Sequence, residues 1–211
     1  MKANYIIAAV LALILILFGV GAYAYNVYEQ NKISKEADSL LIRNYSYVLG
    51  DENADITVVE FFDLMCAACV RISPIVAKLP EKYKGRVKVV YRALAFHQGS
   101  NVVSSLLEAA KEQGKFEETM AAFNIYYKNW YANNQLNTFI AWGILEQVGV
   151  DIKKAREFLD KNQAKIDMQL NQNIEDAQKL GVNATPTFFI NKKMIKHNDL
   201  TQEIEALLGN E

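Results

Sequence analysis

Two cysteines, Cys66 and Cys69, stand three positions apart and are the only cysteines among the 211 residues of the chain. They follow a β-branched and aromatic run over 56–62, typical of a buried strand, and they begin a stretch of helical character that reaches Lys82. A thiol at a helix N-terminus lies near unpaired N–H groups and the positive end of the helix dipole, which stabilise its thiolate. Because the thiolate is the nucleophile of thiol–disulfide exchange, we predict that Cys66 attacks and that Cys69, one turn later, resolves the mixed disulfide.

Other uses of a cysteine pair fit the neighbouring residues less well. A c-type haem site requires His directly after the second cysteine, where Val70 stands, and a copper-chaperone loop carries Met where Leu64 stands. A zinc site would need His97 and His197, which are not at ligand spacing from one another. An inert disulfide that closes so short a loop adds little stability. We therefore predict no metal and no organic cofactor.

The elements around the pair predict a parallel β-unit. The strand over 56–62 leads into a helix from Cys66 to Lys82, which Pro74 is expected to kink because proline lacks the N–H that a helix interior needs. A second strand is predicted over 87–91. Strand, helix and strand in this order imply a right-handed crossover between parallel strands.

The rest of the chain predicts a helical block and then a second β-containing part. Helical patterns run from Ser100, a candidate cap, to Leu180, with one helix after Asp151 and a long polar one over 163–180. Strand character returns over 187–190, followed by a hairpin to a short strand at 194–195 and a final helix. The fold class is therefore α/β, with the helices inserted between two halves of one sheet.

The N-terminus predicts a membrane anchor. Residues 5–25 are almost wholly apolar and would span about 30 Å as a helix, which matches the hydrocarbon core of a bilayer. Lys2 before this run favours an N-inside orientation that exports the rest of the chain. A cleaved signal peptide, with a site at Ala22-Tyr23-Ala24, is the alternative. The predicted organisation is an anchor over 1–26, a tether over 27–46 and one domain over 47–211.

The overall charge argues against a nucleic-acid partner. The formal net charge is −1 and the isoelectric point is about 6.2, so the chain has no surplus of basic residues. Binding to nucleic acid requires clustered Lys and Arg that neutralise phosphates.

Three segments together resemble the DsbA-like branch of the thioredoxin superfamily. They are the strand that runs through Asp63 into Cys66-Ala67-Ala68-Cys69, the stretch 96–100 (FHQGS), and the stretch 181–190 (GVNATPTFFI). The similarity covers roughly residues 47–208. It implies a thioredoxin-like sheet with a helical insertion over about 98–180, and a cis Thr185–Pro186 peptide bond packed against the cysteine pair.

The resemblance also implies roles for three further residues. Glu60 matches an acid that lies beneath the pair and moves the proton of the second cysteine, here Cys69, through water. The alternative interpretation is a solvated acid at the rim of the strand. Thr185 and Pro186 match the substrate-binding turn, where the backbone of Thr185 pairs with a bound peptide as an added strand.

The sequence leaves the direction of the reaction open. DsbA carries His between its cysteines, whereas Ala67 and Ala68 offer no charge here. We predict an oxidase that forms disulfides, with a reductase or isomerase as the alternative and a redox-inert peptide-binding or chaperone module as a second one. The expected partners are protein or peptide thiols and a membrane protein that recycles the pair, in the periplasm or another extracytoplasmic space.

Three further interpretations concern side chains outside the cysteine pair and the substrate-binding turn. His97 is interpreted as a loop or capping residue, and Arg92 as a candidate partner for Glu60. The aromatic cluster over 126–131 is interpreted as packing within the helical insertion, with a substrate groove as the alternative.

Overall fold

A computed structural model describes residues 19–21, 23–25, 39–196 and 199–209. The chain divides into two compact units, Met1–Ser39 and Leu40–Glu211, and the second contains the sheet and the cysteine pair. Most of the predicted anchor, residues 1–18, 22 and 26, and the tether residues 27–38 lie outside the described residues. Within the described ranges, no helix combines the length and the apolar character needed to cross a membrane.

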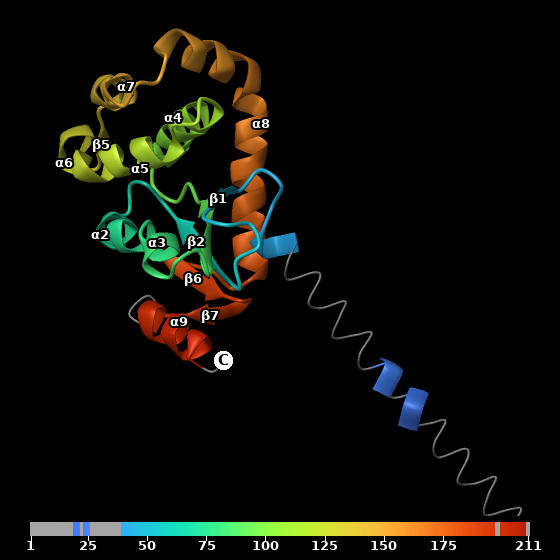
Figure 1. The fold of residues 1–211 in the computed structure, drawn as a ribbon. Coiled ribbons are helices and arrows are strands. Elements are labelled where there is room, and N and C mark those ends of the chain that lie inside the picture. Colours follow the sequence, from blue (N-terminus) through green and yellow to red (C-terminus); the bar gives the residue numbers. More distant parts are fainter. Residues whose placement is uncertain (1–18, 22, 26–38, 197–198, 210–211) are drawn as a thin grey trace, which may run out of the picture. The chain divides into compact units, whose positions relative to one another are not determined.

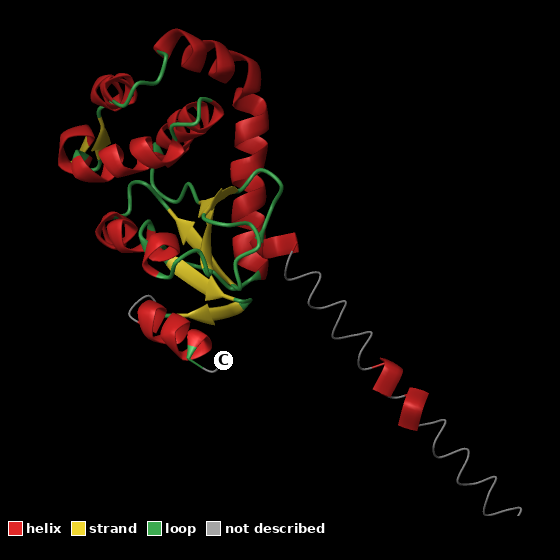
Figure 2. Ribbon diagram, viewed as in Figure 1, coloured by secondary structure: helices red, strands yellow, loops and turns green. Residues whose placement is uncertain are grey.

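A five-stranded sheet forms the centre of the second unit, in the order β1-β3-β2-β6-β7 (Figure 2). The strands are β1 (Tyr47–Leu49), β2 (Ile56–Phe62), β3 (Val87–Ala93), β6 (Thr187–Ile190) and β7 (Lys193–Ile195). β2 and β3 are parallel, as predicted, and the other pairs are antiparallel. The thioredoxin-like α/β fold and the sharing of one sheet by the two β-containing halves are confirmed, whereas β1 was not predicted.

Helices surround this sheet, and most of them belong to the segment between β3 and β6 (Figure 1). The helices are α2 (Ala67–Val76), α3 (Leu79–Lys82), α4 (Ser100–Glu112), α5 (Phe116–Ile125), α6 (Tyr127–Trp130), α7 (Thr138–Gln147), α8 (Ile152–Lys179) and α9 (Leu200–Leu208). A small hairpin of β4 (Tyr131–Ala132) and β5 (Gln135–Leu136) joins α6 to α7. Figure 1 shows α8 running from the inserted helices back to the sheet.

Several helix boundaries differ from the predicted ones. The helix expected from Cys66 to Lys82 continues through Pro74 and ends at Val76, and α3 begins at Leu79 with Pro80 in its first turn, because Pro80 has no N–H to continue the bonding of the first helix. The two helices expected over 151–180 are one helix, α8, which the side chain of Asp151 caps by accepting from Lys154 N at 3.1 Å. The position before α4 belongs to Gly99, whose φ of 93° suits glycine, so Ser100 does not cap that helix.

Side chains along β2 alternate between the two faces of the sheet, and this alternation places Glu60 and Arg92 on opposite faces. Val58 and Phe62 face one core, whereas Val59 and Phe61 face the other, so Glu60 belongs to the first face. Arg92 lies opposite Phe61 in the parallel register and points to the second face. The suggested pairing of Arg92 with Glu60 is therefore wrong.

On its own face Arg92 is completely buried and has other partners. Its guanidinium donates to Asp176 Oδ2 at 2.6 Å, to Asn173 Oδ1 at 3.0 Å, and to the carbonyls of Leu40 and Leu41. Arg43 also binds Asp176, at 2.6 Å. This cluster ties the start of the unit to α8 and β3.

Candidate active site

Both cysteines lie at the junction of β2 and α2, on the side of the sheet that carries Glu60. Cys66 occupies the position before the first turn of α2 in an extended conformation, and Cys69 lies inside that turn. Cys66 is half-buried, Cys69 is 4% exposed, and the two sulfurs are not joined in a disulfide. The structure thus shows the dithiol form, with one sulfur accessible and one enclosed.

Thr185 and Pro186 reach Cys66 from the far end of the chain. The peptide bond between them is cis, as the resemblance implies. The Sγ atom of Cys66 lies 3.2 Å from the main-chain oxygen of Thr185 and donates to it when it carries its proton. The loop before β6 therefore places backbone directly beside the accessible sulfur.

The two thiols have opposite electrostatics. A hydrogen bond from the Cys69 thiol is the largest contribution that lowers the pKa of Cys66 to about 5; burial opposes it, and the side chain of Thr185 and the backbone of Ala68 and Cys69 assist it. The pKa of Cys69 is raised well above its usual value because its thiol donates to Cys66 and because it is buried near the charge of Glu60. At neutral pH the pair is one thiolate and one thiol.

Glu60 is enclosed beneath this pair. Its side chain is 2% exposed, which excludes the alternative of a solvated acid at the strand rim. Burial, and secondarily the negative charge of Cys66, raises the pKa of Glu60 to about 8. It lines a small cavity with Cys69, Ser73 and Asn124, whose volume of about 10 Å³ is near the lower limit for one water molecule.

Asp63 is buried and accepts several hydrogen bonds, a role that the sequence did not predict. Its Oδ1 accepts from Met65 N at 2.9 Å and from Ser100 Oγ at 2.7 Å. Its Oδ2 accepts from Phe96 N at 3.0 Å and His97 N at 3.1 Å, and contacts His97 Nδ1 at 2.8 Å. Asp63 therefore fixes the connection before Cys66 to the loop that follows β3, where His97 lies as predicted.

Tyr127 of α6 links the inserted helices to the segment between β2 and α2. Its hydroxyl donates to the main-chain oxygen of Met65 at 2.6 Å. Burial, together with charge on Tyr131 and Cys66, raises the pKa of Tyr127 to about 12, so the phenol keeps its proton. The neighbouring Trp130 is completely buried and bonds Phe123 O, which confirms the packing interpretation for that residue.

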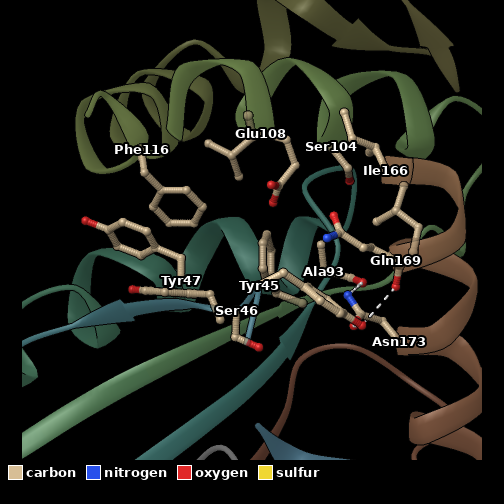
Figure 3. A pocket seen from close by; sticks show the side chains of 14 residues that line it. Tyr45, Ser46, Tyr47, Ala93, Ser104, Glu108, Phe116, Ile166, Gln169 and Asn173 are labelled. Atoms are coloured by element: carbon tan, nitrogen blue, oxygen red, sulfur yellow. Dashed lines mark hydrogen bonds between the residues drawn. The ribbon is translucent and has the colours of Figure 1, made fainter. Parts of the chain in front are cut away.

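A second recess, between β1, α4 and α8, contains none of the predicted site residues (Figure 3). Tyr45 there donates to Asn173 Oδ1 at 3.0 Å, and the ring of Tyr47 stacks on Phe116 at 3.8 Å between centroids. Tyr45 and Asn173 thus bond within the recess, and Asn173 also donates to Ala93 O, so these contacts pack α8 on the sheet.

Comparisons with known sequences agree with this geometry. The sequence model of the thioredoxin family matches residues 43–210. Disulfide bond formation protein D of Bacillus subtilis is 31% identical over 180 residues, which cover 78% of this chain and 76% of that protein. The Na(+)/H(+) antiporter NhaA 1 of Salinispora arenicola is 27% identical over 164 residues, which cover 76% of this chain. This chain spans only 23% of the length of that antiporter.

Solved structures share the same arrangement of strands and helices. A thioredoxin-like oxidoreductase from Silicibacter pomeroyi DSS-3 superposes with a TM-score of 0.67 at 26% identity, covering 82% of this chain and 97% of the other. Oxidised BdbD from Bacillus subtilis superposes with a TM-score of 0.65 at 24% identity, covering 77% and 92%. At 24% identity, the likeness to BdbD shows a shared fold.

Proposed function

The chain belongs to the DsbA-like branch of the thioredoxin superfamily, and on that premise we propose that it is a thiol–disulfide oxidoreductase that forms disulfides in other proteins. The observation that carries this proposal is the unequal pair, a half-exposed Cys66 with a pKa of about 5 above a buried Cys69 that keeps its proton. A structural pair of thiols has no need of this asymmetry. Nucleophilic exchange at one sulfur requires it.

The reaction begins with the Cys66–Cys69 disulfide. A substrate thiolate attacks Cys66 Sγ, the bond to Cys69 breaks, and Cys69 leaves with the electron pair and takes a proton. A second substrate thiolate then attacks the substrate sulfur bound to Cys66. The substrate disulfide forms and Cys66 leaves as a thiolate, so two electrons pass from the substrate to the pair.

The stabilised thiolate favours this direction. At pH 7, a fall in the thiol pKa from 9.0 to about 5 favours the reduced pair by about a hundredfold, or about 60 mV for two electrons. Because water screens part of the charge on a half-exposed sulfur, this value is an upper limit. It supports an oxidase even though Ala67 and Ala68 supply no charge.

Glu60 is assigned the proton of Cys69. With a pKa of about 8 it holds a proton while Cys66 is a thiolate. When Cys66 is bound in a mixed disulfide, its negative charge is absent and the pKa of Glu60 falls. Glu60 then loses its own proton more readily and is free to accept the proton of Cys69, which matches the step in which Cys69 attacks Cys66 during recycling of the pair.

Thr185 and Pro186 are assigned to substrate binding. The main chain of Thr185 lies beside Cys66 Sγ and is half-buried rather than enclosed, so an extended peptide can pair with it while its own sulfur approaches Cys66. The catalytic domain is assigned to residues 47–211, with the insertion over about 98–180.

The apolar residues 5–25 are assigned to a single membrane span that holds the domain in the periplasm or another extracytoplasmic space, beside a membrane partner that recycles the pair. Fractionation of cells that express the full chain tests this assignment. Recovery in membranes after alkaline extraction, with the domain open to external protease, supports it. Release of a shortened soluble chain instead supports signal cleavage.

The test of the enzymatic proposal is the reduction potential of the full chain, equilibrated with glutathione. A value toward the −120 mV end of the range of about −270 to −120 mV for this fold supports an oxidase. A value near −270 mV favours the reductase or isomerase alternative. The absence of any reversible transition would refute the enzyme and favour a redox-inert binding module.

A further inference from the structure

The cavity that holds Glu60 and Cys69 adjoins a larger groove between α2 and α5. That groove has a volume of about 340 Å³ and is lined mainly by apolar side chains of the two helices. Three residues line both spaces: Ser73 of α2, and Met120 and Asn124 of α5. The boundary between the small cavity that holds Glu60 and Cys69 and the groove is therefore made by the thioether of Met120 and the polar side chains of Ser73 and Asn124.

These two polar side chains are bonded to one another. Asn124 Nδ2 donates to Ser73 Oγ at 2.6 Å. Ser73 is 8% exposed, whereas Asn124 is half-buried and reaches the surface. Since the Ser73 oxygen accepts this bond, its own O–H hydrogen remains available to another acceptor.

Glu60 lacks a direct partner on its own side of the boundary. Across the described ranges of the chain, no protein group forms a hydrogen bond with its carboxyl, although the side chain is 2% exposed. Asp63 also lines the cavity, but both of its oxygens are occupied by donors from the two loops that it joins. The remaining walls, Phe62, Leu64 and Met120, are apolar.

We infer that Ser73 and Asn124 are positioning residues that connect Glu60 and Cys69 with solvent in the groove. Asn124 orients the Ser73 hydroxyl, and one water molecule in the small cavity joins that hydroxyl to the carboxyl. When Glu60 gives its proton to Cys69, its carboxylate regains one from this water, which is replenished through the Ser73 hydroxyl. The net transfer is one proton from solvent to the pair, and it runs in the opposite direction when Cys69 is deprotonated.

This inference rests on the proposed function, and it gives the inserted helices a part in the chemistry because Asn124 belongs to α5. The alternative is that the Ser73–Asn124 bond only joins α2 to α5. A pair elsewhere in the chain offers a matched control. Gln163 Nε2 donates to Ser105 Oγ at 3.0 Å, Ser105 is likewise buried, and neither residue lines the small cavity.

The test compares Ser73→Ala, Asn124→Ala and Ser105→Ala in the full chain. The oxidised proteins are reduced by dithiothreitol under rapid mixing from pH 5 to 9, and the release of Cys69 is followed by quenching and alkylation. Loss of the proton route is expected to slow this step by about tenfold to a hundredfold in the first two variants, and to flatten its pH profile. Ser105→Ala is expected to keep the wild-type rate and profile.

Two further measurements distinguish an error in the proposed proton route from an error in the proposed function. The pH midpoint of Cys66 alkylation is expected to stay unchanged in all three variants, since this reaction does not need the route. In a Glu60→Gln background, Ser73→Ala is expected to add no further slowing, because both changes interrupt the same path. Equal rates in Ser73→Ala and Ser105→Ala, or full slowing of Ser73→Ala in the Glu60→Gln background, would overturn the inference. Failure of the wild type to exchange at all would instead refute the proposed function.

Discussion

Replacement of Cys69 by Ala should raise the pKa of Cys66, because the largest contribution to the low value is the hydrogen bond from the Cys69 thiol. Cys69→Ala removes this donor and keeps a small apolar side chain in the first turn of α2. Cys69→Ser is the matched control, since its hydroxyl retains an O–H donor at the same position.

The size of the effect follows from the strength of such a bond. A hydrogen bond to a charged group contributes about 1.5–3 kcal/mol, which corresponds to about one to two pKa units. Because Cys66 is half-exposed, water replaces part of the lost bond, so we expect the lower end of this range. The pKa of Cys66 should therefore move from about 5 toward about 6 in Cys69→Ala and stay near 5 in Cys69→Ser.

The assay is the rate of alkylation of Cys66 by iodoacetamide as a function of pH. Cys69 in the wild type contributes little, because it is 4% exposed and keeps its proton in this range. A midpoint in Cys69→Ala equal to that of the wild type would refute the assignment of the dominant cause. An equal rise in both variants would show that packing of the thiol, and not its donated hydrogen, holds the pKa of Cys66 down.

Three further predictions concern the residues that hold the site and the unit together. Asp63→Ala leaves several buried donors without an acceptor and should lower the free energy of unfolding by about 3 kcal/mol, measured with urea. Tyr127→Phe removes only the bond to Met65 and should cost about 1 kcal/mol in the same assay. Asp176→Asn leaves Arg92 buried without its counter-charge and should cost about 3–5 kcal/mol at pH 7. Burial alone would raise the pKa of Asp176, but hydrogen bonds from Arg43 and Arg92 outweigh burial and lower this pKa. The wild type should therefore lose the stability that ionised Asp176 contributes as the pH falls below about 4. Asp176→Asn should show no such loss, because it has no carboxyl to protonate. An equal loss at low pH in both proteins would contradict that assignment.

Local sequence patterns were sufficient for the strands that carry the site. β2 and β6 were predicted with their observed bounds, 56–62 and 187–190, because each is rich in β-branched and aromatic residues that pack into both cores. β1 was missed because three residues carry no periodic signal, and it forms only by pairing with β3. The continuity of α8 was also missed, because its apolar face is interrupted at Asn162 and Gln163.

Local sequence patterns could not predict contacts between segments that are far apart in the chain. The position of Asp63 after a buried strand was visible in the sequence, but its function as a hub depends on the loop over 96–100 returning to it. The assignment of Arg92 to Glu60 failed for a related reason. Both belong to strands that were predicted correctly, but their register decides which face each side chain occupies.

The alanine spacer changes how the reactivity of the pair must be understood. With no charged side chain between the cysteines, the thiolate of Cys66 depends on groups that the fold brings to it: the Cys69 thiol, Thr185 and the backbone at the start of α2. The Cys69 contribution exists only in the reduced pair, because a sulfur in the disulfide has no hydrogen to donate. It therefore stabilises the state that oxidation of a substrate produces and gives nothing to the state that precedes it. An oxidising pair can in this way arise from a spacer that appears inert in the sequence.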